Sequence, residues 1–242
     1  MKSLRSALFL VFFLFFPVFF MAEAESIYTG QIIEDSKNDC SFFVPRLSSV
    51  TGTKMPVIVC LPGKNVRSKD DLKLWKKSAA ENGFFVINMD VDYPSIQKET
   101  DLRRIQFRID QTLKEVSKIY NLRADEIYIA GTSSGGAIAL SLALRYPKEY
   151  LATGIISGSP MQFNASFYLI NAEQRHFYII HGDRDGSVPI QLAYETKQSL
   201  EDSGADVKFM KVSNGEHILP AFTYEAMVQW FAFQENIYQN SL

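Results

Sequence analysis

The chain has 242 residues, and its 25 Lys and Arg residues nearly balance its 27 Asp and Glu residues, which leaves a formal net charge of −2. Hydrophobic residues make up 47% of the chain and cysteines number only 2, as in an ordinary globular protein. Because the Lys and Arg residues are scattered, with no basic run, we expect no nucleic-acid partner.

The first residues have the pattern of a secretory signal peptide. Lys2 and Arg5 precede an almost wholly apolar run from Ala7 to Met21, and Ala22-Glu23-Ala24 supplies a small-residue cleavage site. The run is shorter than the roughly 20 residues that a spanning helix needs. We therefore expect cleavage after Ala24, a secreted or periplasmic location and no stable membrane insertion of residues 25–242. An uncleaved N-terminal anchor is the alternative.

The remaining chain is expected to form one α/β domain. An opening antiparallel hairpin is followed by apolar strands that alternate with amphipathic helices, which predicts a mostly parallel, doubly wound sheet covered on both faces. The connection between Ile156 and Arg175 is too short for a large lid. The expected strands are 27–33, 40–44, 56–61, 84–88, 127–130, 151–156, 175–181 and 207–212, and the expected helices are 68–82, 102–120, 136–146 and a C-terminal helix.

The two cysteines leave two alternatives open. Cys40 begins one expected strand and Cys60 ends another. An exported protein permits a disulfide between them, and two buried free thiols are the other possibility.

The segment Gly131-Thr132-Ser133-Ser134-Gly135 lies between an apolar β-branched run and a run of small residues with helical spacing. A G-x-S-x-G sequence between a strand and a helix is typical of a nucleophile elbow, a sharp turn that exposes its serine. This context indicates that Ser133 is a nucleophile.

Catalysis by a serine needs a base, and the acid and base follow the elbow in this class of site. Of the three histidines, only His217 lies in a loop beyond the candidate acids, so it is the expected base. His176 lies within a strand pattern and is expected to be structural, whereas His181 is expected to form local hydrogen bonds beside the acid loop. Asp183 and Asp185 compete for the role of the acid.

A resemblance to a known family separates the two aspartates. The segment from His181 to Pro189 resembles the H-G-x-x-D-x-x-V-P loop of small α/β-hydrolases, in both the carboxylesterase/acyl-protein thioesterase group and the polyhydroxyalkanoate-depolymerase/feruloyl-esterase group. The resemblance implies an α/β-hydrolase fold and assigns the acid to Asp185. It extends to the strand 57–63, where Pro62 replaces the histidine that usually precedes the glycine.

These residues predict a serine hydrolase that works through an acyl-enzyme. Ser133 would attack the carbonyl carbon, His217 would accept and return the proton, and Asp185 would orient the imidazole. The backbone N–H groups of Lys64 and Ser134 are the expected oxyanion hole. We expect neither a metal nor an organic cofactor.

The substrate is less well defined by the sequence. Tyr93, Phe163 and Phe167 are candidates to line a substrate pocket. For Tyr93 a solvated loop with a turn at Pro94 is the favoured alternative, and loop packing is an equally good interpretation of the two phenylalanines. A small open site favours carboxylic esters with a short or medium acyl or aryl group, either as small molecules or linked to a polymer. The alternatives are a peptidase or polyester depolymerase with the same residues, and a non-catalytic binding protein on a hydrolase scaffold. The oligomeric state is left open.

Overall fold

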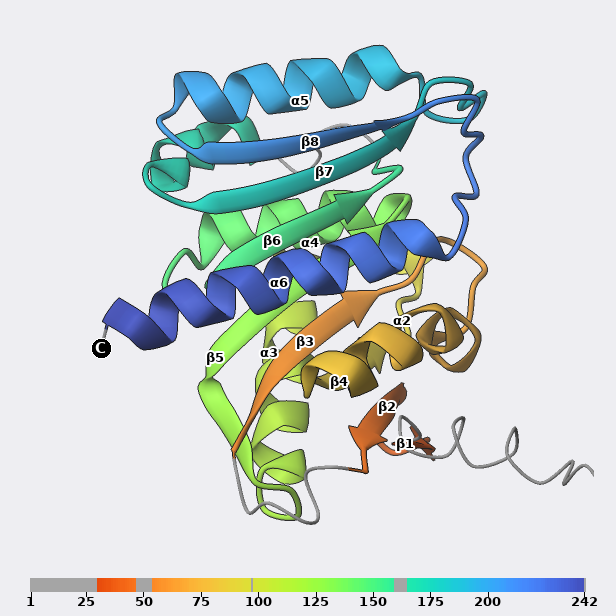
Figure 1. Cartoon of the computed structure of the whole chain (residues 1–242), viewed down its shortest axis with the longest axis vertical. Helices are drawn as coiled ribbons and strands as arrows, with labels where there is room; N and C mark the ends of the chain where they lie inside the picture. The colour runs from red at the N-terminus through yellow and green to blue at the C-terminus, as the bar shows by residue number, and fades with distance from the viewer. Residues whose placement is uncertain (1–29, 47–53, 97, 159–164, 242) are drawn as a thin grey trace, which may run out of the picture.

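A computed structural model describes residues 30–46, 54–96, 98–158 and 165–241. They form an eight-stranded sheet with the order β1-β2-β4-β3-β5-β6-β7-β8 (Figure 1). The strands are β1 Gly30–Asp35, β2 Cys40–Pro45, β3 Met55–Leu61, β4 Phe85–Met89, β5 Leu122–Thr132, β6 Ala152–Ile156, β7 His176–Gly182 and β8 Asp206–Val212. The helices are α2 Ser68–Asn82, α3 Glu99–Val116, α4 Ser134–Arg145, α5 Ile190–Asp202 and α6 Phe222–Ser241, with short 3-10 helices η1 Tyr93–Ser95 and η2 Ala165–Ala172.

The sheet has the expected direction of strands. β1 and β2 form an antiparallel hairpin, β2 pairs antiparallel with β4, and all pairs from β4 to β8 are parallel. The predicted fold class, a mostly parallel doubly wound sheet with an N-terminal hairpin, is therefore confirmed. The expected signal peptide lies outside the described residues.

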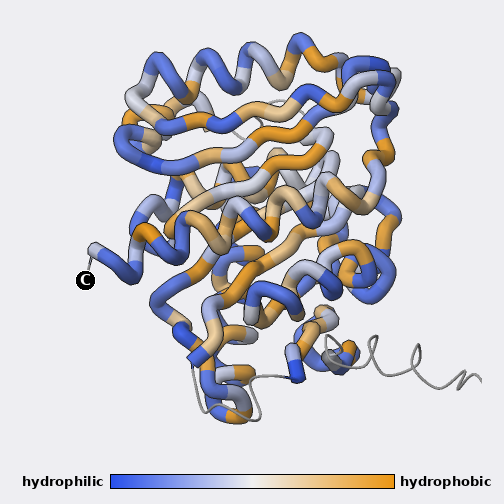
Figure 2. The backbone as a smooth tube through the Cα atoms, in the orientation of Figure 1, coloured by the Kyte–Doolittle hydropathy of each residue, from blue (hydrophilic) through white to orange (hydrophobic). Residues whose placement is uncertain are grey.

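Two hydrophobic layers hold the sheet between helices. Apolar side chains of α3, α4 and α5 pack with one face of the sheet, and those of α2 and α6 pack with the other. Along β3, Val57 and Val59 belong to the first layer and Ile58 to the second, and all three are fully buried. This burial on both faces explains why the central strands read as unbroken apolar runs, the hydrophobic band visible in Figure 2.

The two cysteines belong to opposite layers. Cys40 packs in the layer of α3, whereas Cys60 packs in the layer of α2, and both are buried free thiols. A disulfide requires the two Cβ atoms to lie within about 4.5 Å. Side chains that leave the sheet on opposite faces do not meet this condition, so the free-thiol alternative holds.

Three elements differ from the expectation, and the first is α3, which spans Glu99–Val116 instead of 102–120. β5 begins at Leu122, five residues before the expected 127, and α5 fills a stretch for which no helix was predicted. The buried positions of α5 include the small Ala193 and the polar Thr196, so its apolar stripe is weak in the sequence. No helix in the described parts of the chain combines the length and apolarity that crossing a bilayer requires.

Candidate active site

The turn between β5 and α4 has the geometry of a nucleophile elbow. Ser133 has φ 55° and ψ −121°, a combination that is costly for any residue with a side chain. A methyl group added to Gly131 would lie 2.2 Å from the carbonyl oxygen of Gly135, and one added to Gly135 would lie 2.1 Å from that of Leu61. Glycine is therefore required at both positions, because backbone atoms occupy the space that a side chain would need.

The strained serine is held from the neighbouring strand. The backbone N–H of Ser133 donates a hydrogen bond of 2.9 Å to the carbonyl oxygen of Ile156, the last residue of β6. The hydroxyl is thereby presented at the carboxyl edge of the parallel strands, where ligands bind in open α/β sheets.

The structure brings three of the predicted side chains into one hydrogen-bonded chain. His217 Nε2 lies 2.9 Å from Ser133 Oγ, and His217 Nδ1 lies 2.8 Å from Asp185 Oδ2. The three residues follow β5, β7 and β8, so the parallel sheet places them at one edge although 84 positions separate Ser133 from His217. An imidazole between a hydroxyl and a carboxylate can take a proton from the hydroxyl.

The surroundings of Asp185 favour its ionised form. Its burial opposes the charged form, but hydrogen bonds from the Val188 N–H, from His217 and from the Ser187 N–H outweigh this effect and lower the pKa of Asp185. Its Oδ1 accepts the two backbone N–H groups at 2.8 and 2.9 Å, which leaves Oδ2 to face the imidazole. A carboxylate at Oδ2 keeps the hydrogen of His217 on Nδ1 and leaves Nε2 free to accept a proton.

Asp183 lies elsewhere in the same loop. Its carboxylate is part-exposed, and its Oδ2 lies 3.9 Å from Lys211 Nζ on β8. Its backbone N–H donates to Val212 at 3.1 Å. The geometry favours Asp185 over Asp183 as the partner of His217.

The other two histidines, His181 and His176, lie at opposite ends of β7. His181 is fully buried, and its Nε2 lies 2.8 Å from the carbonyl oxygen of Val188 and 3.3 Å from Asp185 Oδ2. Because a carbonyl only accepts, Nε2 carries the hydrogen, and Asp185 lies between two imidazoles. These contacts within the acid loop are the local hydrogen bonds that the sequence predicts for His181. His176, at the opposite end of β7, pairs with Asp206 at 3.0 Å.

The loop after β3 lies beside the elbow. A methyl group added to Gly63 would lie 3.5 Å from Ser133 Cβ. The Val66 N–H donates to the Gly63 oxygen at 3.1 Å, which closes a turn with Asn65 at φ 64°, a conformation that asparagine tolerates. Lys64 occupies the second position of this turn, and the turn's own hydrogen bond does not use its N–H.

The second predicted oxyanion donor begins a helix. Ser134 is the first residue of α4, and the first N–H groups of a helix have no acceptor within it. The N–H groups of Lys64 and Ser134 thus both belong to segments that adjoin Ser133.

The structure describes two of the three predicted pocket residues. Phe163 lies outside the described residues, and Phe167, in η2, is 79% exposed. The Tyr93 hydroxyl donates a hydrogen bond to the carbonyl oxygen of Pro62. Sequence reasoning missed this contact, because it joins residues 31 positions apart on two different loops.

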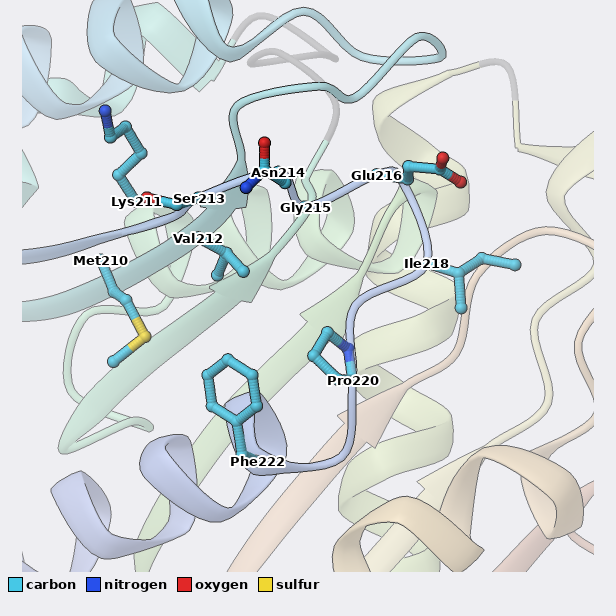
Figure 3. Close-up of a pocket in the computed structure, with 10 residues that line it drawn as sticks. All are labelled: Met210, Lys211, Val212, Ser213, Asn214, Gly215, Glu216, Ile218, Pro220 and Phe222. Atoms are coloured by element: carbon cyan, nitrogen blue, oxygen red, sulfur yellow. The ribbon is translucent and has the colours of Figure 1, made fainter.

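A cavity of about 460 Å³ lies behind the His217 loop (Figure 3). Figure 3 shows the Phe222 ring rising from the start of α6 between Met210 and Pro220, whereas Ile218 points away from them. Neither Ser133 nor His217 lines this cavity, so we do not assign it to the substrate. In the described part of the chain, no group of three or more His, Cys, Asp or Glu side chains is arranged to hold a metal ion.

Comparison with known proteins gives a consistent result. A family model described as Phospholipase/Carboxylesterase matches residues 86–234. No curated protein matches the sequence significantly.

Solved structures resemble this fold over most of its length. An S-formylglutathione hydrolase from Agrobacterium tumefaciens has a TM-score of 0.65 at 12% identity, covering 85% of this chain and 94% of its own. An S-formylglutathione hydrolase from Staphylococcus aureus has a TM-score of 0.68 at 16% identity, covering 84% and 95%. Est1E from Butyrivibrio proteoclasticus has a TM-score of 0.62 at 15% identity, covering 86% and 99%. At these identities the likeness establishes the shared fold.

Proposed function

The chain belongs to the phospholipase/carboxylesterase family, and on this premise we propose that it is a serine esterase whose catalytic triad is Ser133, His217 and Asp185. The observation that carries the proposal is the hydrogen-bonded chain from Ser133 Oγ through the two nitrogens of His217 to Asp185 Oδ2. A serine on a strained elbow, beside two backbone N–H donors, adds the other element that acyl transfer requires.

In the first half-reaction, Ser133 Oγ attacks the carbonyl carbon of the ester while His217 Nε2 takes the hydroxyl proton. The resulting oxyanion would be bound by the N–H groups of Lys64 and Ser134. The intermediate collapses with loss of the alcohol, which receives its proton from His217, and the acyl group remains on Ser133.

In the second half-reaction, His217 takes a proton from water, and the oxygen of that water attacks the acyl carbon. The carboxylic acid leaves, and Ser133 Oγ regains its proton from His217. Asp185, which stays ionised, stabilises the imidazolium in both halves without itself being protonated.

We further propose a carboxylic ester with a short or medium acyl or aryl group as the substrate class. The short connection between β6 and β7 supports this, because it offers little chain with which to cover a long acyl group. The S-formylglutathione hydrolases are named for a thioester substrate, so a thioester is a useful second probe.

The decisive experiment is hydrolysis of p-nitrophenyl esters from acetate to palmitate by the chain starting at Glu25, beside its Ser133→Ala variant. Turnover that decreases with chain length and vanishes in the variant is the expected result. If the folded protein hydrolyses no ester, a serine-directed fluorophosphonate decides between the alternatives. Labelling would favour a peptidase or depolymerase, and no labelling would favour a binding protein.

Export is a separate proposal, supported by the charged, apolar and small-residue order of residues 1–24. Expression of the full chain in a secreting host should release a protein whose amino-terminal residue is Glu25. Recovery of the intact amino terminus in the membrane fraction would instead indicate an anchor.

A further inference from the structure

The loop that carries one expected oxyanion donor contains two peptide groups that must be held separately. We call residues Pro62–Val66 the oxyanion loop. The Lys64 N–H shares a peptide plane with the Gly63 oxygen, which the Val66 N–H holds at 3.1 Å. The preceding plane carries the Pro62 oxygen, which accepts the Tyr93 hydroxyl. Since the glycine between the two planes is flexible, neither bond restrains both.

The Pro62 carbonyl touches the elbow as well. A methyl group added to Gly135 would lie 2.6 Å from the Pro62 oxygen, so this carbonyl packs directly against the turn that presents Ser133. Proline has no N–H with which to anchor itself. A displaced Pro62 carbonyl would therefore move the oxyanion loop relative to the nucleophile.

Tyr93 is suited to hold this carbonyl. Its ring packs against the hydrophobic layer of α3 and α4, so the hydroxyl is carried on a fixed support. Burial, and to a smaller extent the charge of Asp71, raise the pKa of Tyr93, so the hydroxyl keeps its hydrogen. A carbonyl can only accept, and the tyrosine is therefore always the donor in this bond.

We propose that Tyr93 is a positioning residue that fixes the Pro62 carbonyl and thereby aligns the Lys64 N–H with the oxyanion formed on the acyl carbon. The inference rests on the proposed esterase function. It also replaces the expected contact between Tyr93 and substrate with an action through the oxyanion loop.

The test compares Tyr93→Phe with Tyr150→Phe in the full chain. Each variant removes one hydroxyl and leaves the ring in place, a part-buried ring for Tyr93 and a buried ring for Tyr150. Tyr150 is a suitable control because its hydroxyl also donates one hydrogen bond, to Gln106 Oε1 at 2.7 Å. The residue precedes β6 and so lies at the end of the sheet opposite Ser133. Titration with a fluorophosphonate counts the active sites, and thermal unfolding of both variants reports any loss of fold.

Complete loss of one oxyanion donor typically lowers turnover about 100–1,000-fold. Misalignment is milder, so we expect kcat per active site to fall at least about tenfold in Tyr93→Phe, with KM within about twofold of the wild type. Binding of a trifluoromethyl ketone, whose adduct with Ser133 carries an oxyanion, should weaken by the same factor. Tyr150→Phe should change none of these quantities.

Three results would overturn the inference. Equal kcat values in the two variants would show that the hydroxyl is not needed for alignment. A higher KM with an unchanged kcat would show that Tyr93 contacts the substrate. If the wild type itself has no turnover, the proposed function fails and this inference with it. The proposed function survives the first two results if the wild type is active and Ser133→Ala is inactive. In that case the positioning role alone is refuted.

Discussion

Replacing Asp185 by asparagine tests the assignment of the catalytic acid. The Oδ1 atom accepts two backbone N–H groups, so the amide oxygen of Asn must occupy that side and its NH₂ group must take the place of Oδ2. The NH₂ group would then donate to His217 Nδ1, which moves the imidazole hydrogen to Nε2. In that tautomer Nε2 has no lone pair with which to accept the proton of Ser133.

The magnitude follows from the wrong tautomer. An equivalent exchange at a triad acid lowers kcat by about 10⁴, which corresponds to about 5 kcal/mol of barrier. The second N–H of this NH₂ group would face the Nε2–H of His181 across 3.3 Å and find no acceptor there, because that Nε2–H is itself a donor, to the Val188 carbonyl. A buried unsatisfied donor costs about 1–3 kcal/mol of folding free energy. For a domain of this size that lowers Tm by about 2–12 °C.

The assay measures p-nitrophenyl ester turnover and thermal unfolding of Asp185→Asn beside Asp183→Asn. Asp183 lies part-exposed at 3.9 Å from Lys211, and such a pair contributes about 0–1 kcal/mol. Asp183→Asn should therefore keep its activity within about twofold. The reasoning is refuted if Asp183→Asn loses more activity than Asp185→Asn, or if the Asp185 variant keeps most of its activity.

Three further outcomes are expected. Ser133→Ala and His217→Ala should each lower kcat by several orders of magnitude and the double variant little more, because the members act as a unit; additive losses would show independent roles. The folded-state pKa of Asp185 is lowered, so its stabilisation is complete above its unfolded value of about 3.9 and disappears as pH falls through the folded value. Denaturant titrations should show the stability gap between wild type and Asp185→Asn narrowing below about pH 4. Finally, Gly135→Ala should unfold or inactivate the protein because its methyl group would meet a carbonyl oxygen at 2.1 Å, whereas Gly186→Ala, with nothing within 4 Å, should fold and unfold like the wild type.

Much of the fold and of the candidate site could be predicted because the signals are local. The G-x-S-x-G turn between Ile129 and Ala137 is contiguous, and backbone collisions at its glycines explain why the pattern is so restrictive. His217 stands out because few histidines exist, and the acid loop is a short motif. Parallel strands then bring the three side chains to one edge of the sheet without any further signal in the sequence.

Other features depend on pairing that residue order does not encode. The opposite orientation of Cys40 and Cys60 follows from the register of β2 and β3 in the sheet. The bond from Tyr93 to Pro62 requires the loops after β3 and β4 to meet, which a parallel neighbourhood of these strands brings about. The second imidazole beside Asp185 depends on how the acid loop folds back over His181.

The position of β8 gives the three side chains of the proposed triad unequal support. β5 and β7, which precede Ser133 and Asp185, each have a strand on both sides. In the part of the chain that the structure describes, β8, which precedes His217, is an edge strand bonded only to β7. Edge elements open at lower free energy than the centre of a sheet. Detachment of β8 would move His217 away from Ser133 while the elbow and the acid loop stayed folded. On heating, turnover should accordingly be lost at a lower temperature than the one at which the domain unfolds. Loss of turnover would then be an early indicator of local opening.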